Sequence, residues 1–143
     1  MFIKIALLTF LVFTSFTATA GSWALDCHSG IGRIQFTDSS HATLAVSSNQ
    51  IVISSTAERE DRTYRFFYSD TVELGRGGMM LNWDSFSKQK SLATGTLLED
   101  GGLLFTWKGF YSPVTNDYIW AKDADYVLKN GQKTMKLDRC EKY

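Results

Sequence analysis

The stretch L-A-T-G-T-L-L-E-D-G-G-L-L-F-T-W-K-G, residues 92–109, decides the fold class of this 143-residue chain. The stretch looks like two β-strands joined by the E-D-G-G turn at residues 99–102, because apolar-rich runs lie on both sides of a turn signal. Asp-Gly favours a tight turn because both residues tolerate a positive φ. We therefore predict a hairpin of two antiparallel strands, with Thr94-Gly95 on the first strand and Lys108-Gly109 at the end of the second.

Hydrophobic side chains recur with a two-residue period on both sides of this hairpin. Turn-forming residues fall between the apolar runs, and Asn130-Gly131 is a strong signal for a hairpin turn. No window of a dozen residues has helical spacing with caps, and Asn82–Lys90 is at most a short helix. The other apolar runs, read as strands, are residues 23–27, 34–36, 44–46, 51–53, 64–68, 72–74, 79–83, 126–128 and 135–137.

Many short strands spaced by about ten residues imply an antiparallel sandwich or barrel. We predict an all-β fold, a small antiparallel β-barrel of about eight to ten strands, because the chain is too short to fill two full sheets. Residues 21–143 form this single domain. The mixed-charge residues 58–62 are expected to form a solvated loop between strands, and Pro113 lies in another loop.

Residues 1–20 have the pattern of a cleaved export signal. Lys4 gives a basic start, Ile5–Phe16 is apolar, and Ala18-Thr19-Ala20 is the small-x-small pattern that signal peptidase accepts. The apolar run is shorter than the about 20 residues of a spanning helix, and no cysteine follows the cleavage site to carry a lipid. We expect a soluble exported protein without a membrane anchor, either periplasmic or extracellular.

The charge balance argues against two classes of partner. The chain has 15 Lys and Arg against 15 Asp and Glu, a formal net charge of zero. Loss of Lys4 with the signal would lower this charge by one. Nucleic acids and anionic membranes are recognised by basic surfaces, so neither is expected as the main partner.

Cys27 and Cys140 are the two cysteines of the chain, one near each end of the expected mature protein. In an exported protein an even pair predicts a disulfide. This bond would tie the first strand to the last and stabilise the fold by roughly 4–5 kcal/mol. The alternatives are a reactive thiol or a zinc site with His28 and His41, but the spacing matches no zinc pattern. We expect no metal and no cofactor.

No sequence motif for catalysis is present. His28 and His41 lie beside turns and outside any triad context. Asp84, Glu99 and Asp100 are the carboxylates that could pair for glycoside hydrolysis. Asp100 is better explained as the turn residue before Gly101, and Glu99 as its exposed neighbour. There is no phosphate loop, dinucleotide fingerprint or calcium loop. We therefore expect a binding protein rather than an enzyme.

Aromatic residues are abundant, with ten Phe, six Tyr and four Trp. One group close together in the sequence could stack on sugars or line a site for an apolar ligand. The alternative is packing inside the barrel, since small barrels are usually filled by side chains. This group comprises Trp107, Phe110, Tyr111, Tyr118 and Trp120.

The hairpin segment resembles the membrane-bound and periplasmic inhibitors of C-type lysozyme, the MliC/PliC family. That family has a small residue and Ser-Gly on one strand, an Asp-Gly turn, and an aromatic strand ending in Lys-Gly. Its cysteines are also placed early and late. Thr94 replaces the usual Ser, and Leu97-Leu98 replaces an Arg-Tyr pair. The matching positions are Ala93-Thr94-Gly95, Asp100-Gly101, Phe105, Trp107 and Lys108-Gly109.

The resemblance implies an eight-stranded barrel whose partner is a lysozyme or another cell-wall hydrolase. Thr94 and Lys108 would then enter the enzyme's cleft, which contains two catalytic carboxylates. An ammonium about 4 Å from one of these gains roughly 4 kcal/mol at an effective dielectric of about 20, before desolvation. The other implied contacts are Gly95 and Gly109, which permit close backbone approach, and Trp107 and Tyr111 on the rim.

Two other functions are compatible with the sequence. The aromatic group could bind a glycan or a small apolar ligand, which would make the protein a ligand-binding barrel. The protein could also be a structural envelope protein without a ligand. The inhibitor hypothesis is the one that assigns roles to Thr94 and Lys108.

Overall fold

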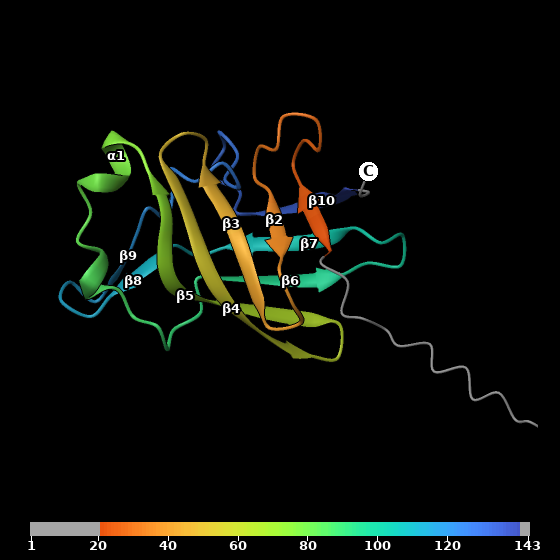
Figure 1. The fold of residues 1–143 in the computed structure, drawn as a ribbon, viewed down its shortest axis with the longest axis horizontal. Helices are drawn as coiled ribbons and strands as arrows, with labels where there is room; N and C mark the ends of the chain where they lie inside the picture. The colour runs from red at the N-terminus through yellow and green to blue at the C-terminus, as the bar shows by residue number, and fades with distance from the viewer. Residues whose placement is uncertain (1–20, 141–143) are drawn as a thin grey trace, which may run out of the picture.

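The computed structural model describes residues 21–140, and the predicted export signal at residues 1–20 lies outside them. Eight antiparallel strands form a closed barrel (Figure 1), which confirms the predicted all-β fold. No helix within residues 21–140 is long and apolar enough to cross a membrane. In order around the barrel the strands are β1 (Ser22–Ala24), β10 (Thr134–Cys140), β7 (Leu103–Trp107), β6 (Ala93–Leu97), β5 (Thr63–Leu74), β4 (Ile51–Glu60), β3 (His41–Ser47) and β2 (Ile34–Phe36).

Alternating side chains fill the inside of the barrel. Buried and partly exposed residues alternate along β3 and the first part of β4, as the two-residue period predicts. Burial of each large apolar side chain contributes about 1.5–3 kcal/mol. The interior is therefore a packed core. Its fully buried members include Ile34, Leu44, Ile51, Ile53, Phe66, Leu103, Phe105 and Leu137.

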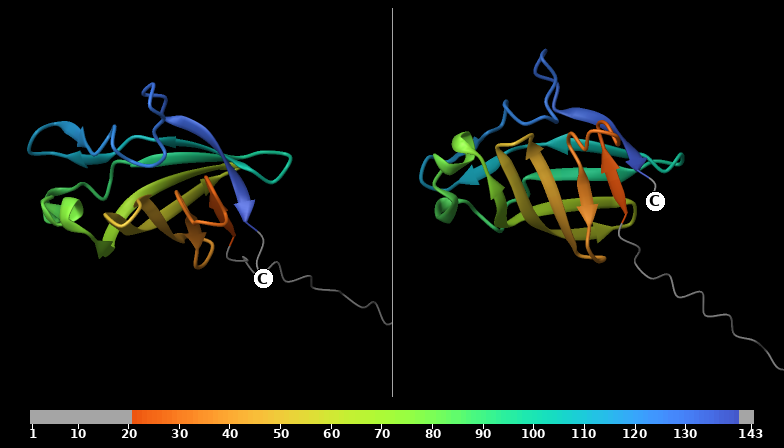
Figure 2. Two further views of the ribbon diagram at one scale, coloured as in Figure 1. Left: turned by 90° about the horizontal axis from the view of Figure 1, so that it is seen from above. Right: turned by 45° about the horizontal axis from the view of Figure 1, so that its top comes forward.

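A second, smaller group of aromatic rings lies at one end of the barrel. There the hairpin of β8 (Phe110–Ser112) and β9 (Asp117–Ile119) meets the segment of α1 (Arg76–Met79) and the 3-10 helix η1 (Trp83–Ser85), as Figure 2 shows. Phe110 is the centre of this group, because its ring contacts those of Tyr68, Trp83, Phe86 and Trp107 at centroid distances of 4.9–5.9 Å.

The strand predicted at residues 79–83 is wrong, because α1 and η1 occupy this region. The run at residues 72–74 is not a separate strand but the end of β5. Gly75 and Gly78 explain the turn between them. A Cβ on Gly75 would lie 2.0 Å from the Asn49 carbonyl oxygen, and one on Gly78 would lie 2.3 Å from that of Gln50. The chain passes so close to the β3–β4 turn that side chains are excluded.

The strand predicted at residues 126–128 is also wrong, because this segment forms turns that cover one end of the barrel. Asp125 fixes it to the β3–β4 turn. Its backbone N–H donates to the Val46 carbonyl at 2.8 Å, and its carboxylate accepts the Ser48 N–H and hydroxyl at 2.9 Å each. Tyr126 is buried against Phe105, with ring centroids 4.5 Å apart. Burial raises the pKa of the Tyr126 hydroxyl well above its ordinary value.

Two predicted turns differ in their outcome. Asn130-Gly131 is a turn as predicted, with the Gly131 N–H donating to the Leu128 carbonyl at 2.8 Å and a Gly131 φ of 86°. The loop predicted at residues 58–62 is shorter than expected, because β4 continues to Glu60. Asp61 has a φ of 58° and makes a tight turn into β5.

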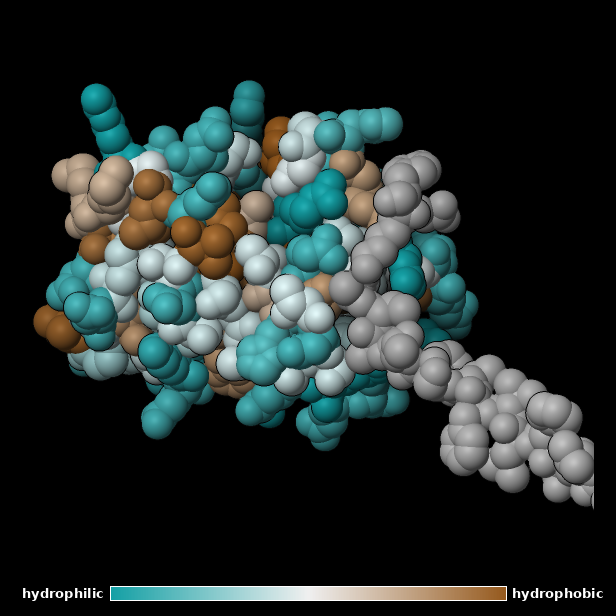
Figure 3. Space-filling view, viewed as in Figure 1, coloured by the Kyte–Doolittle hydropathy of each residue, from teal (hydrophilic) through white to brown (hydrophobic). Residues whose placement is uncertain are grey.

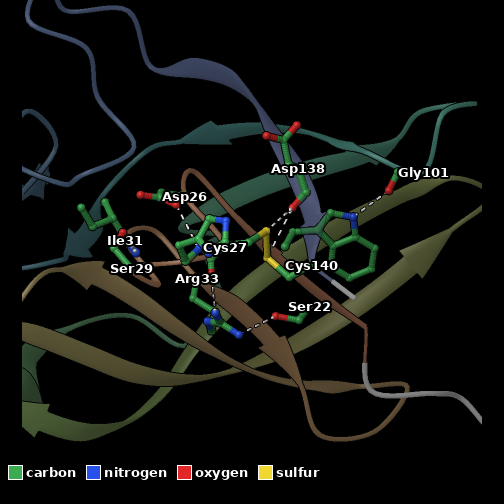
Figure 4. Close-up of a disulfide and its surroundings, with 11 residues drawn as sticks. Ser22, Asp26, Cys27, Ser29, Ile31, Arg33, Gly101, Asp138 and Cys140 are labelled. Carbon is green, nitrogen blue, oxygen red and sulfur yellow. Dashed lines mark hydrogen bonds between the residues drawn. A yellow bond between two sulfur atoms is a disulfide. The ribbon is translucent and has the colours of Figure 1, made fainter. Parts of the chain in front are cut away.

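The Cys27–Cys140 disulfide joins the segment after the first strand of the barrel to the last strand, as predicted (Figure 4). Cys140 ends β10, where it pairs with Ser22 of β1, and Cys27 follows β1 in the chain. The Arg33 guanidinium donates to the Cys27 carbonyl at 3.0 Å and to the Ser22 hydroxyl at 3.4 Å. The bridge therefore lies at the seam where the barrel closes.

Candidate functional site

The register of the β6–β7 hairpin places Thr94 and Lys108 on the same outer face. Ala93 pairs with Trp107 and Thr94 with Thr106, and both Ala93 and Trp107 are fully buried. Because side chains alternate between the faces of a sheet, Thr94 points away from the core, and Lys108, the first residue after β7, is partly exposed. They are diagonal neighbours, a relation in which Cα atoms are typically about 7–8 Å apart. The structure thus brings together the two residues that the resemblance singled out.

Lys108 keeps an ammonium that no carboxylate neutralises within the described part of the chain. Its Nζ donates to the Ser91 hydroxyl at 3.0 Å, and its backbone N–H donates to the Leu92 carbonyl at 2.8 Å. These bonds hold the residue on the outer face without cancelling its charge. The ion pairs of residues 21–140 join other residues, namely His41 and Asp38, Arg65 and Glu58, and Lys136 and Asp100.

Trp107 is not a rim residue, and its predicted contact with a partner is wrong. Its side chain is 0% exposed and its ring contacts Phe110 and Tyr126. Its Nε1–H donates to the Trp120 carbonyl at 3.0 Å. Trp107 lies two residues after Phe105 in β7, and side chains two residues apart in a strand point to the same face. The Trp107 side chain therefore points into the barrel, as that of Phe105 does. Its role is to join the barrel core to the aromatic group beside it.

The two glycines of the predicted site serve the packing of this chain. A Cβ on Gly95 would lie 3.0–3.1 Å from carbons of the Leu103 side chain inside the barrel. Gly109 has a φ of +113°, and a Cβ there would lie 2.8 Å from the Ile119 carbonyl oxygen. Internal contacts thus favour glycine at Gly95 and require it at Gly109, whereas close approach of the backbone to a partner's cleft stays a prediction.

Tyr111 lies on the partly exposed side of the β8–β9 hairpin, as a contact residue requires. Its hydroxyl donates to the Asn116 side-chain oxygen at 3.3 Å, and its ring lies 5.2 Å from that of Tyr118. The Lys90 ammonium lies 4.0 Å from the centre of the Tyr111 ring. Lys90 was not singled out from the sequence, because its pairing with Tyr111 exists only in the folded chain.

The turn of the β6–β7 hairpin is fixed at the other end of the same strands. The Trp23 Nε1–H donates to the Gly101 carbonyl at 2.9 Å. Asp100 forms an ion pair with Lys136 and accepts the Gly102 N–H at 2.9 Å. The Lys136 ammonium and then this N–H hold the pKa of the Asp100 carboxyl below its ordinary value. The predicted Asp-Gly turn is thus part of the framework that keeps the hairpin in place.

This lowered pKa predicts a loss of stability in acid. A carboxyl whose pKa is lower in the folded state stabilises the fold above its unfolded pKa, and this contribution is lost as the pH falls through the folded value. We expect the free energy of unfolding to decrease as the pH is lowered from about 5 towards 2. The Asp100→Asn variant should show a smaller decrease, measured by urea unfolding at each pH. Equal pH dependence in both proteins would contradict this.

The three carboxylates considered for glycoside hydrolysis are not assembled as one site. Glu99 and Asp100 lie in the β6–β7 turn, whereas Asp84 lies in η1 at the opposite end of the molecule (Figure 1). Asp100 is already paired with Lys136. The paired carboxylates that glycoside hydrolysis requires are therefore not formed by these residues.

His41 has Ser and Asp neighbours, but their geometry differs from that of a catalytic triad. The His41 Nδ1 lies 2.9 Å from an Asp38 carboxylate oxygen and 3.2 Å from the Ser40 hydroxyl. A triad needs the acid and the nucleophile on different ring nitrogens. Asp38 also accepts the Ser40 N–H at 2.8 Å, and this bond lowers the pKa of its carboxyl. We interpret the cluster as an exposed turn between β2 and β3.

One exposed apolar area lies away from the hairpin. Val72, Met79 and Met80 are 55%, 64% and 85% exposed. Figure 3 shows hydrophobic side chains gathered near the end of β5 and α1, on the face formed by β3–β5, whereas β6 and β7 lie behind it. The apolar area and the surface of Thr94 and Lys108 therefore belong to different faces of the barrel.

No model of a known protein family, no curated protein and no solved structure matches this chain. Among residues 21–140, no group of three or more His, Cys, Asp or Glu side chains is arranged to hold a metal ion. What the structure defines is the class of protein. It is a small closed barrel of eight antiparallel strands whose first and last strands are joined by a disulfide.

Proposed function

We propose that this protein is an exported inhibitor of a lysozyme or a related cell-wall hydrolase, and not itself an enzyme. The outer face of the β6–β7 hairpin enters the active-site cleft of the target. The observation that carries the proposal is the register Thr94 to Thr106, which makes Thr94 and Lys108 diagonal neighbours on an outward surface. These are the positions to which the family resemblance assigns the contact.

The electrostatics of the hairpin support this proposal. Lys108 has a hydroxyl partner in Ser91 and no carboxylate partner among residues 21–140, so its charge is available to an acidic group. A lysozyme cleft offers such groups in its catalytic carboxylates. The Thr94 hydroxyl can donate to a carboxylate or accept a backbone N–H of the cleft. One cation and one hydroxyl thus complement the cleft without any metal or cofactor.

The disulfide supports the proposed export. Disulfides form and persist in oxidising compartments such as the periplasm and the extracellular space. The Cys27–Cys140 bond fits that environment, and the signal pattern predicted at residues 1–20 would take the chain there. Both are places where a cell-wall hydrolase acts.

Lys108→Ala is expected to weaken inhibition of a C-type lysozyme by at least about 30-fold. The physical reason is that truncating one partner of a desolvated charge pair costs about 2–5 kcal/mol. The measurement is a cell-wall lysis assay with the oxidised mature protein at increasing molar ratios to the enzyme. Thr94→Val keeps the shape of the side chain and removes its hydroxyl, and it should weaken inhibition less strongly.

The matched control is Lys129→Ala, which removes an exposed lysine from a loop remote from Thr94 in the sequence. This control should inhibit as well as the wild type. The proposed mechanism is excluded if Lys108→Ala inhibits like Lys129→Ala. The proposed function itself is excluded for a lysozyme type that the wild-type protein does not inhibit at large molar excess.

A glycan-binding surface is the second candidate, and one observation favours it. Tyr111 and Tyr118 are partly exposed on the same hairpin, and Asn116 lies beside the Tyr111 hydroxyl. Aromatic rings with a nearby amide are common in ligand sites. Trp107 and Phe110 are buried and contribute nothing to it. Titration with cell-wall glycan fragments, followed by tryptophan emission, tests this candidate, and a flat titration counts against it.

A further inference from the structure

We propose that the partner-binding surface extends from Lys108 to a second ammonium, that of Lys90, which Tyr111 holds in position for a carboxylate on the rim of the target's cleft. This inference rests on the proposed function and adds a contact to it. The residues that carry it lie in the loop of residues 87–91 and in β8, outside the β6–β7 hairpin.

The loop that carries Lys90 is fixed against β8. The Ser87 backbone N–H donates to the Tyr111 carbonyl at 2.8 Å. The Ser87 hydroxyl in turn accepts the N–H groups of Gln89 and Lys90, at 3.1 and 3.2 Å. The backbone of Lys90 thus has a defined position, although its side chain is exposed.

Tyr111 orients the Lys90 side chain without neutralising it. The ammonium lies 4.0 Å from the centre of the ring, within the range of a cation–π contact. The ring is itself held by the edge contact with Tyr118 and by the bond from its hydroxyl to Asn116. A cation over an aromatic face keeps its full charge, so it remains able to bind an anion.

Lys90 and Lys108 are connected through the loop of residues 87–91. The Lys108 Nζ donates to the hydroxyl of Ser91, the residue that follows Lys90 in the chain. The two ammoniums are therefore linked through adjacent loop residues. Lys108 lies at the end of the β6–β7 hairpin, and the Lys90 ammonium lies over the Tyr111 ring of β8, so two different elements position them.

Lys90 and Lys108 are held in place by an aromatic ring and a hydroxyl rather than by a carboxylate. Arg65 of β5 is bound to Glu58, and Lys136 of β10 is bound to Asp100. Neither Lys90 nor Lys108 takes part in an ion pair within residues 21–140. Two cations that the fold positions but does not neutralise are complementary to an acidic cleft with charged groups on its rim.

Lys90→Ala is expected to weaken binding of the target lysozyme about five- to tenfold and to reduce the dependence of the association rate on salt, because a rim charge acts mainly on association. The matched control is Lys88→Ala, which removes an exposed lysine from the same loop. It should change the dissociation constant by less than about twofold. The measurement is surface plasmon resonance at several salt concentrations.

Two substitutions of Tyr111 test whether its ring positions the Lys90 ammonium, or whether the charge of Lys90 acts without that contact. Tyr111→Phe keeps the aromatic face under Lys90 and should bind within about twofold of the wild type. Tyr111→Leu removes that face and should weaken binding to the same extent as Lys90→Ala. In the double variant the two losses should not add, because both remove the same contact. Circular dichroism and thermal unfolding identify any variant that is not folded.

The outcomes distinguish this inference from the function on which it rests. If the wild type binds no lysozyme, both fall together. If the wild type inhibits and Lys108→Ala does not, but Lys90→Ala behaves like Lys88→Ala, the inference alone is wrong. Additive losses for Lys90→Ala and Tyr111→Leu would also overturn it. So would Lys90-dependent binding to an acidic polysaccharide combined with Lys90-independent inhibition.

Discussion

Replacing Cys27 and Cys140 together by serine is expected to lower the free energy of unfolding by about 4–5 kcal/mol. The bond joins residues separated by 113 positions, so it removes much conformational freedom from the unfolded chain. Domains of this kind are stable by about 5–15 kcal/mol in total. Loss of the bridge therefore brings the protein close to the point at which it unfolds at physiological temperature.

The first strand explains why other contacts will not compensate for this loss. β1 has three residues, of which three pair with β10 and two with β2. Trp23 adds a buried ring and a hydrogen bond to the Gly101 carbonyl. These few contacts must close the barrel without the bond. Hydrogen exchange of the amides in β1 should accordingly increase before that of β4 and β5, which form the longest hairpin.

Urea unfolding of the wild type and of the double cysteine variant measures the difference directly. The wild type kept in reductant should match the variant, which controls for effects of serine itself. A loss below about 1 kcal/mol would contradict the expectation and would mean that the unfolded chain is already compact. Single cysteine variants are less suitable, because the remaining thiol is free to form bonds between molecules.

The barrel itself could be predicted because its strands obey one simple rule. Positions such as Ile34 and Phe36, or Phe105 and Trp107, alternate with outward residues, and this period appears in the sequence. The same rule failed at Met79–Trp83, where glycine contacts with the β3–β4 turn bend the chain. Those contacts join residues distant in the sequence, so alternation alone could not detect them.

Of the candidate site, the part that depends on the local hairpin could be predicted, and the part that depends on contacts between distant segments could not. Thr94 and Lys108 share a face because the hairpin turn fixes their register, which is local information. Trp107 is two residues after Phe105, so the alternation of the strand places it inside the barrel and not on the rim. Lys90 depends on its contact with Tyr111, which forms only when the loop of residues 87–91 packs on β8.

Trp107→Ala is expected to lower the free energy of unfolding by about 3–5 kcal/mol, the usual cost of truncating a buried tryptophan. The ring contacts Phe110 on one side and Tyr126 on the other, at centroid distances of 5.4 and 5.7 Å. It thereby joins the aromatic group at the end of the barrel to the barrel core. Removal also leaves the Trp120 carbonyl without the Nε1–H that it accepts at 3.0 Å.

Trp107→Phe provides a variant that stays folded if the alanine variant does not. It keeps most of the buried apolar area and loses the indole N–H, so it should cost less than the alanine substitution. Lys108→Ala, at the next position, should change stability by at most about 0.5 kcal/mol because its side chain is partly exposed. If Trp107→Phe inhibits normally and Lys108→Ala does not, adjacent residues have separate roles, one in packing and one in binding. A Lys108→Ala variant as unstable as Trp107→Ala would instead mean that the outer face of the hairpin is structural.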